Sequence, residues 1–211
     1  NINPRQIIGI TGKSGCGKSS LTKLLVGLYR PQSGMISYDN TDLRLLDLSH
    51  IRSQVSLVDD SSYFFPGSIR ENIARPLPNS SMDRIVWAAQ KVSAHEEIEN
   101  FPDGYETILE ENASNLSTGM RQKLQIARAL IRNPRILIFD DAISGFDVDS
   151  EIKLYDALND ISVGRTVIFV SSRVWHLKLC NKIFVIENGT ISQEGNFENL
   201  SNQDGFFKNT F

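Results

Sequence analysis

The chain has 211 residues, of which 40% are hydrophobic and 22% are charged, and its formal net charge is −3. This composition is sufficient for a sizeable buried core and excludes an intrinsically disordered chain. Lysines and arginines are scattered rather than gathered along one face, so the slightly acidic chain is expected not to bind nucleic acid.

The cysteines and the apolar runs indicate the surroundings of the chain. Cys16 and Cys180 match no metal-ligand spacing and could form one disulfide at most, which favours a reducing, cytosolic setting. The longest apolar runs have the length of strands, far short of a membrane span, and no signal peptide is evident. Since the first residue is Asn rather than Met, the chain is interpreted as a piece of a longer polypeptide.

Strand-like and helix-like patterns alternate along the first half of the chain. A strand over 6–10 precedes a helix over 18–28 and a turn over 31–34. A hairpin-like region is then expected to combine residues 35–38 with residues 55–58. Between Ser68 and Asn100 apolar residues recur at helical spacing, which predicts a mostly helical block.

The second half continues the alternation. A helix from Ser117 to about Asn133 ends before Pro134 and leads into a strand over 136–139. A helix over 151–158 and a strand over 166–170 follow. The last strands, over 182–186 and 190–192, are joined by an Asn188-Gly189 turn. This order is typical of an α/β fold with a parallel sheet.

The segment Gly12–Ser19, which reads GKSGCGKS, directly follows the first predicted strand and opens the first predicted helix. Its glycines allow consecutive backbone N–H groups to turn inward around phosphate oxygens. Lys18 adds a movable positive charge, and Ser19 offers a hydroxyl to Mg²⁺. The alternative, a glycine-rich turn that matches by chance, lacks this strand-to-helix context. The predicted nucleotide-binding residues are Gly12, Lys13, Ser14, Gly15, Cys16, Gly17, Lys18, Ser19 and Ser20.

Two aspartates follow the apolar run 136–139 and would emerge at the end of a buried strand. Asp140 is the predicted Mg²⁺ partner, through a water, because Mg²⁺ keeps much of its hydration shell. Asp141 comes next and is positioned to take a proton from attacking water. The alternative for the pair is the N-cap of a following turn.

The segment Leu116–Ala142, LSTGMRQKLQIARALIRNPRILIFDDA, resembles the signature helix and Walker B strand of ATP-binding cassette (ABC) proteins. The resemblance covers nearly the whole chain. GSIRENI, with Asn72 and Ile73, the stretch Pro102–Tyr105 and the loop 144–147 are similar to the exporter branch, which includes transporters of type I secretion.

The resemblance implies an α/β P-loop NTPase fold in a single nucleotide-binding domain over 1–211. A mixed-sheet core lobe would comprise about 1–66 and 134–211, and a mostly helical subdomain about 67–133, with the strands that usually precede the phosphate loop missing. Two such cassettes, identical or different, dimerise head to tail with ATP between them. Signature residues then reach the partner's nucleotide: Ser117, Thr118, Gly119 and Met120. Capping of the helix by Ser117 or Thr118 is compatible with this role.

The resemblance also implies a transmembrane partner domain, and with it a location on the cytoplasmic face of a membrane as part of an exporter. The contact is expected to involve residues 59–65 and 110–115, with Glu111 where exporters carry a glutamate that relays closure. A solvated acidic loop is the alternative for the second stretch. The cargo is not encoded here, because membrane-spanning segments recognise it.

The chain departs from the family pattern at several positions. Asp141 stands where a catalytic glutamate is usual and is one methylene shorter. Ser172 stands at the switch histidine, and its hydroxyl has neither the reach nor the charge of an imidazole. His176, one helical turn on, is a possible substitute, although an exposed surface histidine explains it equally well. Asp59 replaces the glutamine that links the metal to the membrane domain, and it could still approach Mg²⁺.

Two further departures concern nucleotide contacts. Thr118 and Met120 replace the usual glycine and glutamine of the signature, and the Cβ of Thr118 restricts close approach to a phosphate. The aromatic residue that usually stacks on adenine is absent from this chain, so adenine binding should be weakened.

These changes leave the binding half of the site intact and erode the hydrolytic half. We therefore expect Mg-ATP binding and dimer closure with slow hydrolysis that drives export. One alternative is an essentially non-hydrolysing regulatory cassette paired with a competent partner cassette. Another is a non-transport cassette of chromosome maintenance or DNA repair, which the lack of a long coiled-coil insertion argues against.

Overall fold

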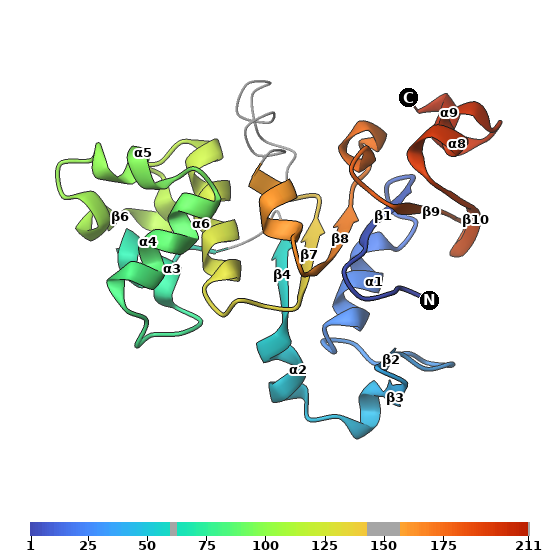
Figure 1. The fold of residues 1–211 in the computed structure, drawn as a ribbon, viewed down its shortest axis with the longest axis horizontal. Coiled ribbons are helices and arrows are strands. Elements are labelled where there is room, and N and C mark those ends of the chain that lie inside the picture. The colour runs from blue at the N-terminus through green and yellow to red at the C-terminus, as the bar shows by residue number, and fades with distance from the viewer. Residues whose placement is uncertain (60–62, 143–156, 211) are drawn as a thin grey trace. The chain divides into compact units, whose positions relative to one another are not determined.

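The computed structural model describes residues 1–59, 63–142 and 157–210 (Figure 1). The chain falls into two compact units, the first formed by residues 1–57, 134–141 and 164–211 and the second by residues 58–133 and 142–163. The boundaries of the core lobe and helical subdomain stay a prediction. In the part of the chain that the structure describes, no helix is both long and apolar enough to cross a bilayer.

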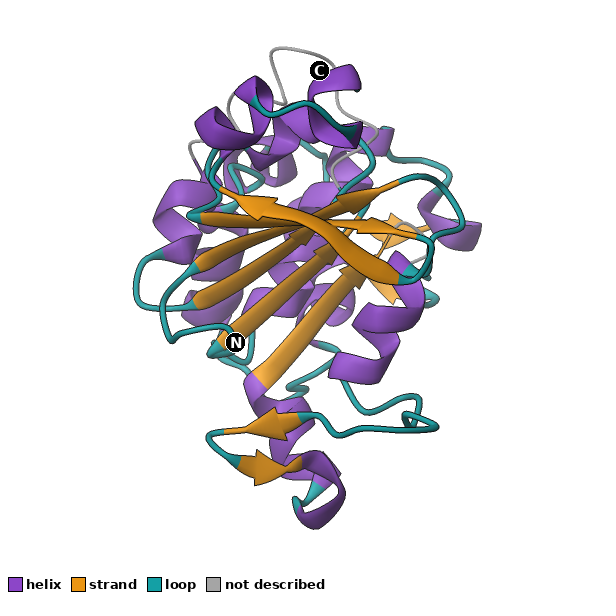
Figure 2. Ribbon diagram, turned by 90° about the vertical axis from the view of Figure 1, so that its right-hand side faces the viewer, coloured by secondary structure: helices purple, strands orange, loops and turns teal. Residues whose placement is uncertain are grey.

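A six-stranded sheet organises the first unit, with the strand order β10-β9-β1-β8-β7-β4 (Figure 2). β1 pairs in parallel with β8 and β9, and β7 pairs in parallel with β8, whereas β10 runs antiparallel to β9. The predicted mixed α/β class is thereby confirmed. The strands are β1 Ile7–Gly12, β4 Val55–Asp59, β7 Ile136–Asp140, β8 Thr166–Val170, β9 Lys182–Glu187 and β10 Thr190–Gly195.

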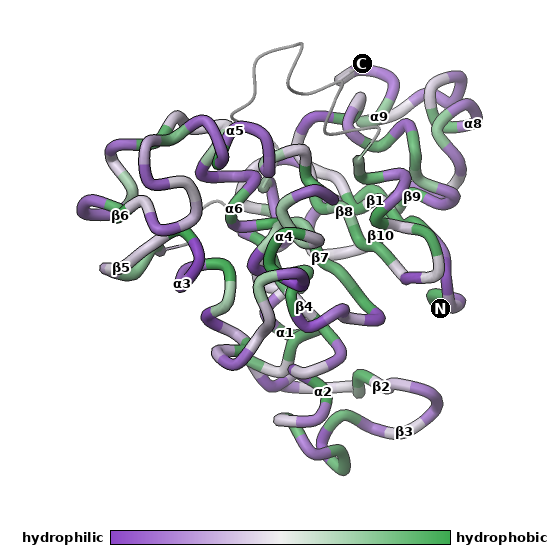
Figure 3. Tube along the Cα trace, turned by 60° about the vertical axis from the view of Figure 1, so that its left-hand side comes forward, coloured by the Kyte–Doolittle hydropathy of each residue, from purple (hydrophilic) through white to green (hydrophobic). Residues whose placement is uncertain are grey.

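The central strands are apolar on both faces, as a sheet covered on two sides requires (Figure 3). One face packs against the helices α1 Lys18–Leu25 and α2 Leu48–Gln54, around Ile8, Ile138 and Ile168. On β7 and β8 the rings of Phe139 and Phe169 stack with centroids 5.0 Å apart. This buried sheet fixes the positions at which β1, β7 and β8 end.

The Asn188-Gly189 turn between β9 and β10 is confirmed, since both residues have positive φ, 51° and 77°. The predicted pairing of residues 35–38 with 55–58 is wrong. Ser37–Tyr38 (β2) pairs with Thr41–Asp42 (β3), and Val55 begins the edge strand β4 of the main sheet. Residues 39 and 40 have φ of 48° and 66°, so a tight turn closes the small sheet locally.

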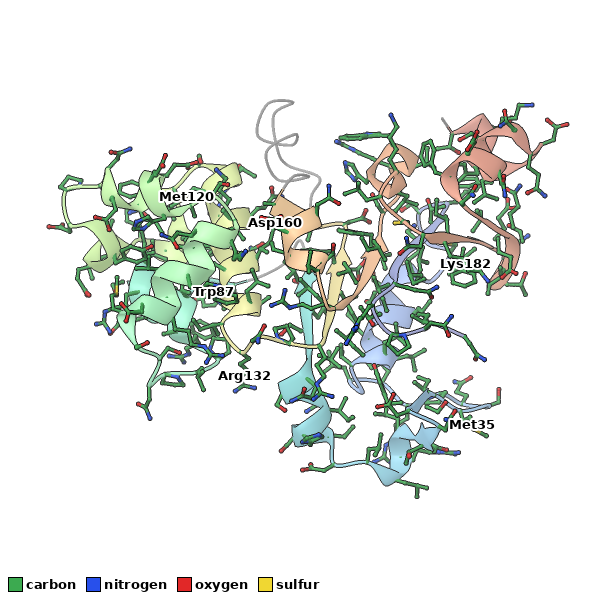
Figure 4. All side chains as sticks on the ribbon, viewed as in Figure 1. Met35, Trp87, Met120, Arg132, Asp160 and Lys182 are labelled. Atoms are coloured by element: carbon green, nitrogen blue, oxygen red, sulfur yellow. The ribbon has the colours of Figure 1, made fainter. Side chains whose placement is uncertain are left out.

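Short elements complete the first unit. They are η1 Leu43–Leu45, η4 Val174–Leu177, α8 Phe197–Asn202 and α9 Phe206–Asn209. Both cysteines are free thiols, and burial raises the pKa of the Cys180 thiol far above its usual value. Met35, labelled in Figure 4 beside β2 and β3, is 69% exposed.

The second unit is mainly helical in its described part, which confirms the helical block predicted over 68–100. The helices α3 and α4 pack against α6, and Ser68 and Glu71 form a capping box at the start of α3. Most of the helix predicted over 151–158 lies outside the described residues. The elements are β5 Gly67–Ser68, α3 Ile69–Ala74, α4 Met82–Lys91, α5 His95–Glu99, η2 Gly104–Glu106, β6 Ile108–Leu109, η3 Glu111–Ala113 and α6 Thr118–Leu130.

Arg128 of α6 holds the segment that precedes β5. Its guanidinium donates to the backbone oxygens of Tyr63 and Asn72, at 2.7 and 2.9 Å, and to Asn72 Oδ1 at 2.9 Å. Burial, and to a lesser extent the charge of Arg75, lowers the pKa of Arg128 to about 10. The guanidinium also lies over the ring of the buried Phe64. These contacts anchor the described residues 63–65 within the second unit.

Candidate nucleotide site

The loop between β1 and α1 has the geometry of a phosphate cradle. Gly12, Gly15 and Gly17 have φ of 150°, 80° and 100°. An added Cβ at Gly15 or Gly17 would meet nothing within 4 Å, so this side of the loop is open. At Gly12 the added Cβ would lie 2.2 Å from the backbone oxygen of Ile186, which only glycine avoids. The open loop leads directly into the N-terminus of α1, which favours an anion.

Lys18, at the first position of α1, is directed back onto the loop. Its Nζ donates to the backbone oxygens of Gly12 and Lys13, at 2.8 and 3.1 Å, and the side chain is only 7% exposed. These contacts hold the ammonium group beside the loop amides. A triphosphate in the loop would compete for this charge as a stronger, ionised acceptor.

Ser19 and Asp140, which are 121 residues apart in the sequence, lie side by side. The hydroxyl of Ser19 donates to Asp140 Oδ1 at 3.2 Å. Asp140 ends β7 and is 5% exposed. Thr22, one turn further along α1 and fully buried, places its Oγ1 2.8 Å from Asp140 Oδ2 and 2.9 Å from the backbone oxygen of Ser19. Thr22 lies outside the phosphate-loop motif and was not predicted as a site residue, although its spacing of three residues from Ser19 puts both on one helix face.

Asp141 lies next along the chain in a different environment. Its φ is 50°, and its N–H donates to the backbone oxygen of Val170 at 2.8 Å. Its Oδ1 accepts the backbone N–H of Ser172 at 3.1 Å, and the Ser172 hydroxyl lies at 3.5 Å. The predicted catalytic pair, Asp141 and Ser172, is thus brought together at the ends of β7 and β8.

His176 is not an exposed surface histidine; that interpretation is wrong. The side chain is 3% exposed, and its Nδ1 lies 2.9 Å from the hydroxyl of the buried Ser171. The same hydroxyl accepts the N–H of Arg173 at 3.1 Å. His176 therefore supports the backbone around Ser172 from inside the first unit.

The signature residues begin α6 in the second unit. Ser117 is its N-cap, and its Oγ accepts the N–H of Met120 at 3.1 Å. Ser117 and Thr118 are exposed and Gly119 is half-buried, whereas Met120, labelled in Figure 4, is 3% exposed. The side chain of Met120 is therefore buried, unlike those of Ser117 and Thr118. Ser117, Thr118 and Gly119 keep the exposure that contact with another chain requires.

Two further predicted residues, Asp59 and Glu111, lie outside both the glycine loop and α6. Asp59 ends β4 and is half-buried. Glu111 is exposed and opens η3, where Asn112 and Ala113 have φ of 51° and 55°. The exporter-like loop 144–147 lies outside the described residues.

The residues of the first unit fit a Mg²⁺ ion held together with phosphates. Mg²⁺ is usually bound by one or two carboxylates together with waters and substrate oxygens. Ser19 and Asp140 supply one hydroxyl and one carboxylate in contact, beside the open loop. No group of three or more His, Cys, Asp or Glu side chains that could hold a metal occurs among the described residues. The arrangement suits a metal whose other ligands come from a nucleotide and from water.

Comparison with known proteins agrees with this geometry. A family model described as "ABC transporter" matches residues 1–144. The leukotoxin translocation ATP-binding proteins LktB of Mannheimia glucosida and Bibersteinia trehalosi are each 42% identical to the chain over 207 residues, which is 98% of this chain. The chain spans 29% of the length of these relatives.

A solved structure shares the fold. The structure of a bacterial Atm1-family ABC exporter with ATP bound superposes with a TM-score of 0.94 at 29% identity. The match covers 99% of this chain and 36% of that exporter chain. The phosphate loop and the strand that carries Asp140 both lie within the matched region.

Proposed function

Because the chain belongs to the ABC transporter family, we propose that it is the ATP-binding cassette of an exporter that binds Mg-ATP firmly and hydrolyses it slowly. The cassette closes head to tail on a second cassette, identical or different, and couples this closure to export across a membrane. ATP is the substrate and Mg²⁺ the cofactor.

The observation that carries the proposal is the contact between Ser19 and Asp140 beside the open glycine loop. A hydroxyl and a buried carboxylate held together at the start of α1 are the groups that orient a metal-bound triphosphate. Mg²⁺, when bound, neutralises part of the phosphate charge. The chain's own contributions are the loop amides, the Lys18 ammonium and the α1 N-terminus, all of which favour anionic oxygens.

Slow hydrolysis follows from the environment of Asp141. Its Oδ1 already accepts the Ser172 N–H, and its side chain is one methylene shorter than glutamate. Since a well-placed general base contributes about two to four orders of magnitude in rate, a displaced carboxylate should retain only part of this. Ser172 adds no positive charge toward a γ-phosphate, and the buried His176 is already bonded to Ser171.

Several features support the partners in this proposal. Ser117, Thr118 and Gly119 begin a helix and are accessible to a nucleotide on another cassette. The LktB relatives are named as translocation proteins, and the solved neighbour is an exporter. A transmembrane domain would meet residues 59–65, of which 63–65 are anchored by Arg128, and residues 110–115. Such a cassette works on the cytoplasmic face of a membrane.

A second candidate function is a regulatory cassette that keeps its ATP bound while a catalytically competent partner cassette hydrolyses ATP and drives transport. The hydrogen bond from the Ser172 N–H to Asp141 Oδ1 favours this regulatory function if it keeps the carboxylate away from the attacking water. Co-purification with a second, different cassette would distinguish it from a homodimeric exporter.

The experiment that tests the proposal is single-turnover hydrolysis by the full-length protein, compared with the Asp141→Glu and Ser172→His double variant. Restoring the base and the switch should raise the rate by about two to four orders of magnitude while Mg-ATP affinity stays within a few-fold. The Ser172→His single variant is the control, because it restores the switch without the base. An equal rate in the unmodified protein and the double variant would contradict the proposed impairment.

A further inference from the structure

We propose that Thr22 is a positioning residue for the metal, acting through Asp140, and that it sets how strongly nucleotide binding depends on Mg²⁺. This inference rests on the proposed function. The Thr22 hydroxyl contacts Asp140 Oδ2 and the backbone oxygen of Ser19, and neither of these oxygens would bind a phosphate. Its influence has to pass through the carboxylate that it holds.

Two hydroxyls from one helix face hold the two oxygens of Asp140. Ser19 Oγ donates to Oδ1 at 3.2 Å, and Thr22 Oγ1 lies 2.8 Å from Oδ2. Thr22 is 0% exposed and Asp140 is 5% exposed, so water does not replace the contact between the Thr22 hydroxyl and Oδ2. A carboxylate held at both oxygens cannot rotate about its Cβ–Cγ bond, and this fixes the direction in which Oδ1 points.

The hydroxyl proton of Thr22 has two acceptors within reach, Asp140 Oδ2 and the backbone oxygen of Ser19 at 2.9 Å. Threonines inside helices often donate only to a carbonyl one turn earlier, which would make Thr22 a purely local feature of α1. An ionised carboxylate is the stronger acceptor, and its distance here is the shorter one. The hydrogen bond to Asp140 is therefore the contact that a substitution would remove.

Loss of the Thr22 hydroxyl should therefore lower the affinity for Mg²⁺ more than the affinity for the nucleotide. Ser19 can offer an oxygen lone pair to Mg²⁺ while its hydroxyl still donates its hydrogen bond to Oδ1. Thr22 keeps Oδ2 occupied, so Oδ1 remains directed at Ser19 and would be the carboxylate oxygen that holds a metal-bound water. Hydrogen-bond partners of metal-binding carboxylates typically contribute 10- to 100-fold to metal affinity.

The test is a Mg²⁺ titration of binding of the fluorescent nucleotide mant-ATP to the full-length protein and to Thr22→Val. Valine keeps the shape and removes only the hydroxyl. The Mg²⁺ concentration for half-maximal effect should rise about 10-fold, whereas mant-ATP affinity in EDTA should be unchanged. Thr22→Ser retains a hydroxyl and should need the same Mg²⁺ concentration for half-maximal effect as the unmodified protein.

The matched control is Thr11→Val in the same unit. Thr11 is also 0% exposed, but its hydroxyl has no hydrogen-bond partner within the described ranges. Its Mg²⁺ titration should be unchanged. If Thr22→Val fails to fold, Thr22→Ala and Thr22→Ser make the same comparison, since both lack the methyl group and only serine has the hydroxyl.

Each outcome decides a different claim. An unchanged Mg²⁺ requirement in Thr22→Val, or in Thr22→Ala relative to Thr22→Ser, overturns the role of Thr22 and leaves the proposed function standing. Equal weakening with and without Mg²⁺ also overturns it, because that result reflects a general structural effect. If the unmodified protein takes up no mant-ATP at any Mg²⁺ concentration, the proposed function itself fails.

Discussion

At the end of β7, Asp140 faces α1 and the phosphate loop, whereas its neighbour Asp141 faces the end of β8. Asp140 is 5% exposed and has hydroxyl partners at both carboxylate oxygens. Asp141 is half-buried, has a left-handed backbone, and has one backbone N–H and a distant hydroxyl as partners. The two consecutive aspartates therefore differ in burial, in backbone conformation and in the number of hydrogen bonds that hold their carboxylates.

This contrast offers a physical reason for the proposed loss of hydrolytic groups beside binding groups that are kept. The binding groups Lys18, Thr22 and Asp140 are all buried and bonded to their surroundings, so changing them also disturbs the fold of the first unit. Ser172 is exposed, and its hydroxyl contributes one contact at 3.5 Å. Replacement at the hydrolytic positions therefore costs little stability.

The largest effect on the binding side of the site is expected for Gly12→Ala. The new Cβ would lie 2.2 Å from the Ile186 backbone oxygen, at a φ of 150°. We expect a loss of roughly 2–4 kcal/mol in the free energy of unfolding together with loss of Mg-ATP binding. Denaturant unfolding measures the first and equilibrium binding the second.

The control for Gly12→Ala is Gly164→Ala, because Gly164 also has a positive φ, 78°, with nothing within 4 Å of an added Cβ. It should lose only about 1–2 kcal/mol, the cost of a left-handed alanine. Equal losses in both variants would refute the steric account of the phosphate loop.

Lys18→Met removes the charge of the binding half and keeps most of its side-chain volume. Affinity for Mg-ATP should fall about 10- to 100-fold, since a charged hydrogen bond to phosphate contributes about 1.5–3 kcal/mol. Isothermal titration calorimetry of the full-length protein gives the value. Lys23→Met, on the same helix but outside the loop, should bind as the unmodified protein does, and a similar loss there would point to a nonspecific charge effect.

A smaller effect is expected for Asp141→Asn, which changes the hydrolytic side of the site. Asparagine tolerates the left-handed backbone and can accept the Ser172 N–H. Single-turnover hydrolysis should fall by about tenfold or less, because a displaced base contributes only part of its usual effect, and Mg-ATP affinity should not change. Asp160→Asn, at an exposed position, is the matched control. A loss beyond about 100-fold would make Asp141 a fully effective base.

Much of this arrangement could be predicted from the sequence, because the patterns involved are local. The run IIGIT followed by GKSGCGKS predicts strand, loop and helix, and ILIFDD predicts a buried strand that ends in two acidic residues. Residues 166–170 form a strand with the predicted bounds, and the glycine after Asn188 specifies the last turn. The contact between Ser19 and Asp140 follows from the parallel order of these elements.

The rest depends on contacts that no local pattern specifies. The Val55 run has strand propensity, but its partner is chosen by the main sheet, while Asp39 and Asn40 close a small hairpin by adopting a left-handed backbone. The apolar neighbours of His176 in VWHLKLC are compatible with its burial, but its contact with Ser171, directly after β8, depends on tertiary packing. Asp141 and Ser172 were expected at one site, but their direct bond depends on the angle of two strand ends.

We expect this cassette to hold a triphosphate far better than it cleaves it. The most direct measurement follows bound nucleotide in full-length protein mixed with less than one equivalent of radiolabelled Mg-ATP. We predict that the label is bound at once and remains mostly ATP long after the Asp141→Glu and Ser172→His variant has converted its own to ADP. Absence of bound label, or conversion to ADP as fast as in the double variant, would contradict the account.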